Sequence, residues 1–236
     1  MSIWTNLGAF ASRIQVPSLS AIVEALRSAF VADPELRRQV AFSVAMIALS
    51  AKMAKADGVV TASEVGAFRE IFHVPQDEER NVSRLYNLAK QDIAGFEAYA
   101  GQMARLCGSG TPNCLVLEDI LDGLFHIAKS DGVIHERELG YLNRVAEIFE
   151  LDEAHFERIV ARHAASGDGD PFLVLGVSHD ASRAEVTSRY RKLVAENHPD
   201  RLIGRGLPAE FIGIANERMA AINAAYSAIE AGWKLA

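Results

Sequence analysis

The sequence predicts an all-α protein built from two parts. Strand patterns are nearly absent, and apolar residues recur at helical spacing along almost the whole chain. A stretch of turn-forming residues, SGDGDP at 166–171, separates a larger N-terminal part from a shorter C-terminal part. Within the larger part, AKADGVVTASEV at 54–65 recurs as AKSDGVIHEREL at 128–139. We therefore expect an amphipathic helical segment at 1–33, a helical bundle at 34–165 and a helical hairpin at 166–236.

The composition excludes several classes of protein. Of the 236 residues, 50% are hydrophobic, which is enough for a sizeable core and argues against disorder. The formal net charge of −7 argues against a protein that coats nucleic acid, because such proteins need an excess of Lys and Arg. Cys107 and Cys114 do not form the paired C-x-x-C knuckles of a zinc ribbon, and we expect both to be reduced. The longest apolar run, 40–51, is too short to cross a bilayer.

The N-terminal segment begins with the pattern of one amphipathic helix, which Pro17 ends. Its apolar face consists of Ile3, Trp4, Leu7, Phe10, Ala11 and Ile14. Residues 1–30 could make peripheral contact with a membrane surface through this face. Alternatively, the face packs on the bundle, or on a second copy of the chain to form a homodimer. Because Arg13 is the only basic residue of this helix, packing on protein is the favoured interpretation.

Each copy of the repeat in the bundle follows one helical run and precedes another. The run after the first copy is GAFREIF, and the run after the second is GYLNRVAEIF. Asp57-Gly58 and Asp131-Gly132 supply the turn between the runs. Two such helix–turn–helix units, with helices between them, predict a compact bundle with an internal two-fold repeat.

The repeated turn also carries the acids of a candidate metal site. Glu64 and Glu138 follow the two glycines at the spacing of the second half of an EF-hand calcium loop. The upstream positions of both loops carry Met, Ile or Lys instead of oxygen ligands, so the two copies would have to share one cation. A competing interpretation is a helix cap, since Thr61 and Glu64 form a capping box. Capping leaves the recurrence of Asp57 and Asp131 unexplained, so both interpretations stay open.

The pair of K-x-D-G-x-x-x-x-x-E units on an all-helical scaffold resembles the TerB family, which is associated with tellurite resistance and stress responses. The resemblance covers about residues 35–160. It implies a helical bundle in which acidic residues of the two copies come together, and it suggests metal binding. Carried over to this chain, the ligands of a divalent cation, calcium or another, would be Asp57, Glu64, Asp131 and Glu138.

The C-terminal part contains two long helical patterns. Ser182 and Glu185 form a capping box for a helix through RAEVTSRYRKLVAEN, which must end before Pro199. The following RLIGRGLP is expected to be a Gly/Pro loop, and a second helix runs from about Ala209 to Trp233. Their apolar stripes predict an antiparallel hairpin with the His-Pro-Asp tripeptide at its exposed tip. The stripes comprise Val186, Tyr190, Leu193 and Val194, then Ala215, Met219, Ile222, Tyr226 and Ile229.

The tripeptide lacks the surroundings of a catalytic site. Its segment has no Ser or Cys nucleophile, no Gly-rich phosphate loop and no third metal ligand. The preceding helix is basic, because residues 182–197 contain four basic and two acidic side chains in an acidic chain. A rigid tip beside a basic helix face indicates a docking surface for an acidic partner rather than an active site.

These motifs together resemble the J domain. The match runs from Asp170 to about Ala231 and contains, in order, PFLVLGV, SRYRKL, HPD and INAAYSAI. The resemblance implies that the chain binds a DnaK-type chaperone and stimulates its ATP hydrolysis, without being an enzyme itself.

The J-domain resemblance also assigns the residues that would contact the chaperone. His198, Pro199 and Asp200 would form the activating tip. The basic face docking on the acidic ATPase domain would consist of Arg189, Arg191 and Lys192, whereas Tyr190 would pack inside the hairpin. Thr187 and Ser188 stand where the family often has further basic residues, so either Arg183 and Arg189 compensate for them or the contact is weaker.

The full order, a TerB-like bundle followed by a C-terminal J domain with the long segment RLIGRGLPAEF, resembles the DjlA group of bacterial co-chaperones. It implies that the bundle selects an unknown client protein or a location. Members can carry an N-terminal membrane span, but no such run is seen here, so we expect a cytoplasmic bacterial protein, with peripheral contact at the inner membrane as an alternative. No nucleic-acid partner and no required cofactor are expected. The alternative function is a metal-binding stress-response sensor in which the J domain is secondary.

Overall fold

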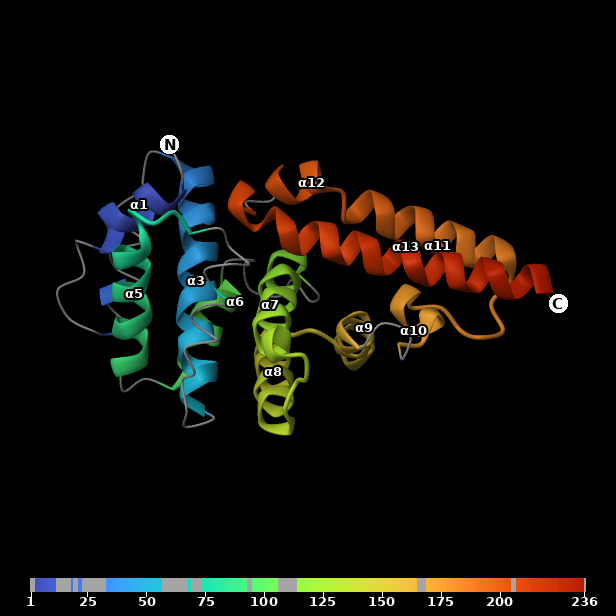
Figure 1. The fold of residues 1–236 in the computed structure, drawn as a ribbon, viewed down its shortest axis with the longest axis horizontal. Helices are drawn as coiled ribbons and strands as arrows, with labels where there is room; N and C mark the ends of the chain where they lie inside the picture. The colour runs from blue at the N-terminus through green and yellow to red at the C-terminus, as the bar shows by residue number, and fades with distance from the viewer. Residues whose placement is uncertain are drawn as a thin grey trace.

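The computed structural model describes residues 3–11, 18, 21–22, 33–56, 68, 74–92, 95–105, 114–164, 169–204 and 207–235. All regular elements in these ranges are helical, so the predicted all-α class is confirmed. Figure 1 shows a bundle of upright helices and a C-terminal hairpin that extends away from it. The chain begins in the bundle and ends at the far end of the hairpin.

The bundle is built around two helices, α3 (Pro34–Ala56) and α7 (Leu115–Ala128). α3 packs against α1, α5, α6, α7 and α8, and α7 also packs against α8 and α9. These surrounding helices span Ile3–Ala11 (α1), Glu79–Gln91 (α5), Phe96–Ala104 (α6), Glu136–Ile148 (α8) and Glu153–His163 (α9). Residues 40–54 of α3 and 117–125 of α7 are all buried, so any charge among them needs a partner inside the protein.

α1 belongs to the core of the bundle. Ile3, Trp4, Leu7 and Phe10 are buried, and α1 packs against α3 and α5. The favoured interpretation, that this helix packs on protein, is therefore confirmed for residues 3–11, which pack on their own bundle. None of the helices in the described part of the chain is both long and apolar enough to cross a membrane.

α7 lies where the bundle meets the hairpin. A Cβ atom at Gly123 would lie 2.7 Å from Met46 Cε on α3 and 2.9 Å from Ile214 Cδ1 on α13 (Ile212–Leu235). Glycine therefore leaves room for the ends of the Met46 and Ile214 side chains against α7 at this position. Cys114, just before α7, is disulfide-bonded, so the expectation that both cysteines are reduced is wrong.

The second copy of the repeated turn forms as predicted. Lys129–Asp131 is one turn of 3₁₀-helix (η2), and Gly132 takes the left-handed φ of 97° that favours glycine. The buried carboxylate of Glu138 accepts the backbone N–H of His135 at 2.8 Å and so caps α8. The turn of the first copy, 57–67, lies outside the described residues, so the internal two-fold repeat stays a prediction.

The hairpin consists of α11 (Arg183–Glu196) and α13 (Ile212–Leu235), preceded by the short α10 (Pro171–Leu175). Asp170 caps α10, and the predicted capping box of Ser182 and Glu185 is present at the start of α11. The two long helices lie side by side and antiparallel (Figure 1). Their apolar stripes meet in a second core formed with α10, whose members include Val174, Leu175, Val186, Leu193, Ile222, Ala225 and Ile229.

The segment after the tripeptide differs from the expected Gly/Pro loop. Pro199–Gly204 forms a short helix, α12, and a 3₁₀ turn (η3) at Ala209–Phe211 leads into α13. Leu202 and Phe211 are buried in the core of the bundle, where the Phe211 ring lies 5.2 Å from that of Phe42. The segment is helical because its apolar residues bury themselves on the bundle, a contact that its Gly and Pro content does not reveal.

Candidate functional site

The His-Pro-Asp tripeptide forms the first turn of α12. The carbonyl of His198 accepts the backbone N–H groups of Arg201 at 2.9 Å and of Leu202 at 3.2 Å. Pro199 occupies the first helical position, where a missing N–H costs nothing and the fixed φ suits the helix. The Nδ1 atom of His198 accepts the backbone N–H of Asp200 at 3.3 Å, so the imidazole itself caps the helix. The tripeptide is therefore a preorganised helix start.

The side chains of this helix start stay open to solvent. The side chain of His198 is 55% exposed and that of Asp200 is 88% exposed, with 3.6 Å between His198 Nδ1 and Asp200 Oδ2. Arg191 and Lys192 on α11 are also exposed. The tip and these two basic residues are therefore accessible to a partner protein.

The two residues before Arg191 serve the hairpin itself. Arg189 is half-buried, and its Nε donates to the carbonyl of Leu175 at 3.0 Å, which ties α11 to α10. Tyr190 stacks on Tyr226 with ring centroids 4.1 Å apart and donates to Asn223 Oδ1 at 3.0 Å. Tyr190 thus packs inside the hairpin as predicted, and Arg189 has a structural contact that the sequence did not indicate.

A buried arginine lies directly behind the tripeptide. Arg218 on α13 is 2% exposed, and its Nη1 donates to Oδ1 of Asn197 at 3.0 Å. Asn197 in turn donates through Nδ2 to the carbonyl of Leu193 at 2.8 Å, at the end of α11. Because Asn197 immediately precedes His198, the guanidinium of Arg218 fixes the position from which the tripeptide starts.

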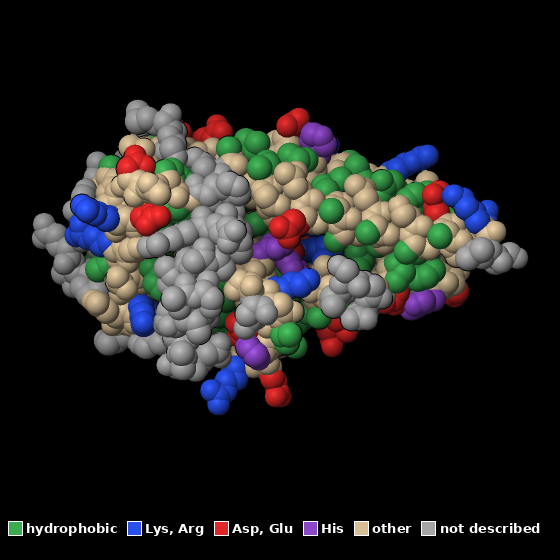
Figure 2. All heavy atoms as spheres, in the orientation of Figure 1, with side chains coloured by type: hydrophobic (Ala, Val, Ile, Leu, Met, Phe, Trp, Pro, Cys, Tyr) green, Lys and Arg blue, Asp and Glu red, His purple; other side chains and the backbone are tan. Residues whose placement is uncertain are grey.

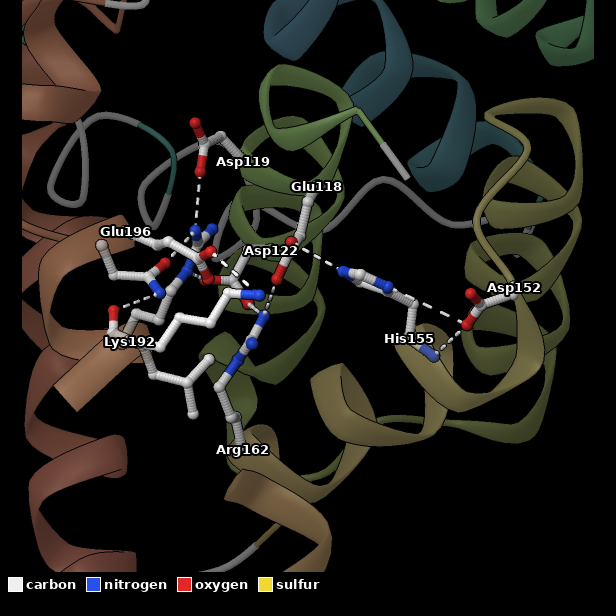
Figure 3. A network of polar contacts seen from close by, with 11 residues as sticks. Glu118, Asp119, Asp122, Asp152, His155, Arg162, Lys192 and Glu196 are labelled. Carbon is white, nitrogen blue, oxygen red and sulfur yellow. Dashed lines mark hydrogen bonds and ion pairs between the residues drawn. The ribbon is translucent and has the colours of Figure 1, made fainter. Parts of the chain in front are cut away.

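The same guanidinium joins the hairpin to the bundle. Arg218 donates through Nη1 to Asp119 Oδ1 at 2.7 Å and through Nε to Asp122 Oδ2 at 2.9 Å. Both aspartates are buried and project from α7 (Figure 3). Charge-assisted hydrogen bonds of this kind are stronger than neutral ones, so they add to the apolar contact between the two regions.

α9 adds a second arginine and two histidines to this contact. Arg162 Nη2 donates to Glu118 Oε1 and to Asp122 Oδ1, both at 3.0 Å, and Figure 3 shows it reaching these acids from α9. His155 Nε2 lies 3.1 Å from Glu118 Oε2, and His163 Nε2 lies 3.0 Å from Asp122 Oδ1. We call these connected residues the junction network: Glu118, Asp119, Asp122, His155, Arg162, His163, Asn197 and Arg218.

The charges of the junction network keep the carboxyls of Asp122 and Glu118 ionised. Burial alone would raise the pKa of Asp122, but the charges of Arg218 and Arg162 hold it well below its ordinary value. Burial would also raise the pKa of Glu118, but the hydrogen bond with His155 and the charge of Arg162 lower it instead. Burial alone would lower the pKa of the Arg218 guanidinium, but the charges of Asp122, Asp119 and Glu118 raise it instead. Glu118, Asp122 and Arg218 are thus charged at neutral pH.

Acid is expected to weaken the fold through Glu118. Its pKa in the folded chain lies below the ordinary value of 4.5, so its ion pairs contribute fully above that pH and are lost as the pH falls further. We expect the urea midpoint of unfolding to drop steeply below about pH 4.5. A Glu118→Gln variant should start with a lower midpoint at neutral pH and show a flatter acid dependence.

The control for this acid test is Glu147→Gln. Glu147 pairs with Arg144 at the surface, where both side chains are 53% exposed. Its loss should cost at most about 1 kcal/mol and leave the acid dependence as in the wild type. Identical acid dependence for the wild type and Glu118→Gln would show that Glu118 is not a source of the pH effect.

The metal site predicted from the repeat is only partly described. Asp57 and Glu64 lie outside the described residues, and so does the side chain of Asp131. Glu138 is described, and its carboxylate is engaged in capping α8. This four-residue site therefore stays a prediction.

A different set of residues could hold a metal ion. Asp122, His126 and His163 each offer one ligand atom, and these atoms all lie within 4.8 Å of one another. The three residues line a cavity of about 300 Å³. Figure 2 shows acidic, basic and histidine side chains meeting in a hollow between the bundle and the hairpin. Burial, together with the nearby charge of His163, lowers the pKa of His126 to about 4, so its imidazole is neutral at neutral pH.

The residues that support the tip could not be found from local sequence patterns. The contact between Arg218 and Asp119 spans 99 residues of sequence. One signal does exist in the sequence: Glu118, Asp119 and Asp122 interrupt the apolar run LVLEDILDGLF. Acids within a buried helix require partners, so this run indicates an internal network without naming the cations.

Two families match successive parts of the chain. The family described as "Tellurite resistance protein TerB" matches residues 43–161, and the DnaJ domain matches residues 170–231. Co-chaperone protein DjlA of Photobacterium profundum is 28% identical over 225 residues, covering 84% of this chain and 80% of that protein. Co-chaperone protein DjlA of Legionella pneumophila is 26% identical over 235 residues, covering 83% and 78%. No solved structure shows a significant match.

The bounds of these matches agree with the order of the helices in the structure. The TerB match begins within α3 and ends within α9, and the DnaJ match contains α10, α11, the His-Pro-Asp tip and most of α13. The matched relatives are co-chaperones, which confirms the expectation that the chain is a co-chaperone and not an enzyme. With a TerB domain that covers half of its length and a DnaJ domain behind it, this chain belongs to the family of DjlA-like co-chaperones.

Proposed function

We propose that this chain binds a DnaK-type chaperone through its J domain and stimulates its ATP hydrolysis, while the TerB domain selects the client protein or the location. The observation that carries this proposal is the exposed helix start formed by His198 and Asp200. Arg191 and Lys192 are accessible on the adjacent helix. The contact residues in the proposal are His198, Pro199, Asp200, Arg189, Arg191 and Lys192.

Charge supports the choice of partner surface. Residues 182–197 hold four basic and two acidic side chains, whereas the whole chain has a net charge of −7. A positive helix on an acidic protein attracts a negative partner surface and orients it during association. The tip adds a preorganised imidazole and carboxylate, which reduces the conformational entropy that is lost on binding.

The proposal assigns separate roles to three segments of the chain, 1–33, 34–165 and 166–236. In this proposal the TerB segment contains the internal two-fold repeat. The repeat is supported by α3 and α7, since each of these helices precedes one of the two turns. The same proposal includes a cytoplasmic bacterial location. Residues 1–30 would position the chain there, through peripheral contact with the membrane or through homodimerisation. The burial of the apolar face of α1 favours contacts with protein over contacts with lipid.

Reversing the charges of Arg191 and Lys192 together is expected to weaken the interaction with DnaK. Steady-state ATP hydrolysis by DnaK, titrated with the wild type, should rise to a plateau. The variant Arg191→Glu/Lys192→Glu should need about tenfold more protein for half-maximal stimulation at low salt. This difference should shrink as salt is added, because exposed charges are screened.

The matched control is Arg137→Glu, which reverses an exposed basic residue on α8 of the bundle. It should stimulate DnaK at the same concentrations as the wild type. Failure of the wild type to stimulate at any concentration would contradict the proposed function. An unchanged half-maximal concentration for the double variant would contradict only the assignment of the basic face.

A further inference from the structure

The junction between the TerB and J domains brings together ligands from three helices. Asp122 and His126 are one turn apart on α7, so they project from the same face of that helix. His163 comes from the last turn of α9, and its ring centroid lies 4.6 Å from that of His126. Glu217 comes from α13 of the J domain, and its Oε2 lies 3.0 Å from His126 Nδ1.

From this arrangement we propose that the junction is a binding site for a transition-metal ion of the zinc class, with Asp122, His126, His163 and Glu217 as ligands. Two imidazoles and two carboxylates are a ligand set that suits Zn²⁺ and Co²⁺. Ca²⁺ and Mg²⁺ prefer sites made of oxygen ligands, so they fit less well. This site is distinct from the acidic site predicted at the repeat, and it does not depend on the proposed contact with DnaK.

The cavity and the spacing of three ligand atoms fit one ion, since one atom each of Asp122, His126 and His163 lies within 4.8 Å of the others, and Glu217 joins them through its contact with His126. The cavity has a volume of about 300 Å³, which leaves room for an ion and its remaining ligands. The atoms His163 Nε2 and Asp122 Oδ1 are 3.0 Å apart, and so are His126 Nδ1 and Glu217 Oε2. Two atoms that each bind zinc at about 2.0–2.2 Å lie at similar separations in a tetrahedral site. The ion would replace the protons that these pairs now share.

The neighbouring cations do not rule out a divalent ion. Lys129, Arg162 and Arg218 line the same cavity. Four acids lie at this junction: Glu118, Asp119, Asp122 and Glu217. Glu118 and Asp119 lie outside the lining of the cavity and pair with Arg162 and Arg218, and the same two arginines already hold the carboxylate of Asp122. Hydrogen bonds from such outer residues orient a metal-binding carboxylate, so the arginines act as supports for the ligand.

A metal ion at this site would link the two domains. Asp122 and His126 lie within the TerB match and His163 lies two residues beyond it at the end of α9, whereas Glu217 lies within the DnaJ match. An ion bound by all four would stabilise the attachment of α13 to α7 and α9. Because Arg218, the next residue after Glu217, holds Asn197 behind the tip, the ion would also strengthen the support of the tip.

The test is a titration of the full-length, chelator-treated chain with Co²⁺ and Zn²⁺. We expect one ion per chain, the visible absorption of four-coordinate Co²⁺, displacement of Co²⁺ by Zn²⁺, and a rise in melting temperature on binding. His126→Gln and His163→Gln should each lower the affinity at least about tenfold. Circular dichroism of each variant verifies that it is folded, and His126→Gln, at the more accessible position, is the primary variant.

Two controls separate this site from others. His179→Gln removes an exposed histidine of the J domain and should leave the affinity unchanged. The pair Asp57→Ala/Asp131→Ala removes acids of the site predicted at the repeat, and it too should leave Zn²⁺ binding unchanged. Absence of saturable binding, or equal affinity in the wild type and His126→Gln, would overturn the proposal. Wild-type affinity for Zn²⁺ in the variant Glu217→Gln would overturn the proposal that the ion links the two domains.

Discussion

Replacement of His198 by Gln is expected to remove stimulation of DnaK while leaving the fold intact. The side chain is 55% exposed and belongs to neither apolar core, so its replacement creates no cavity. Its Nδ1 atom holds the ring against the backbone N–H of Asp200. Gln has more rotatable bonds than His and would lose this fixed orientation before contact with the chaperone. At saturating protein, we expect the ATPase rate of DnaK to fall to that of DnaK alone.

The matched control for this experiment is His179→Gln. His179 is also exposed, lies in the same domain and pairs with Asp170 at 2.9 Å, away from the tip. This variant should stimulate DnaK as the wild type does, and both variants should melt within a few degrees of the wild type. Stimulation by His198→Gln at the wild-type level would remove the tip from the proposed mechanism.

The elements of the hairpin could be predicted because caps depend on residues close in sequence. Asp170, Ser182 and Glu185 form the caps that their positions predict. The helix α12 could not be predicted in this way, because it depends on burial of Leu202 and Phe211 in a core to which distant helices contribute. Gly and Pro residues report where a chain can turn, but they do not report the surface on which a segment packs.

The same limit applies to the site. The His-Pro-Asp tip is visible as a local motif, whereas the contacts of Arg218 span 96 and 99 residues of sequence. Glu217 and Arg218 are adjacent charges in one helical pattern, yet the side chain of Glu217 is 70% exposed and that of Arg218 is 1% exposed. Only the position of α13 against α7 distinguishes them, and that position is a property of the whole fold.

The shared core makes the J domain part of a larger unit. Leu202, Leu207 and Phe211 lie within the DnaJ match but are buried with residues of the TerB domain. A fragment starting at residue 166 would expose these three side chains to water. The tip is therefore held in one orientation relative to the bundle, so a client held by the TerB domain, as proposed, would meet DnaK from a defined direction.

Replacement of Arg218 by Ala is expected to cause the largest loss of stability. It leaves Asp119 buried without the cation that Arg218 supplies and removes one of the two arginines that hold Asp122. Breaking a buried ion pair from one side costs about 3–5 kcal/mol, because a charge remains buried without compensation. Urea unfolding at neutral pH should report a loss of that order.

Arg218→Lys and Arg144→Ala test the cause of this loss. Lysine keeps the charge but lacks the planar fork with which Arg218 reaches Asp119, Asp122 and Asn197 at once, so Arg218→Lys should fall between the wild type and Arg218→Ala. Arg144→Ala breaks only a surface pair and should cost at most about 1 kcal/mol. Because Arg218 also holds Asn197, Arg218→Lys should lower the maximal stimulation of DnaK even where the protein is fully folded. Full stimulation by the folded Arg218→Lys variant would show that the network stabilises the chain without positioning its tip.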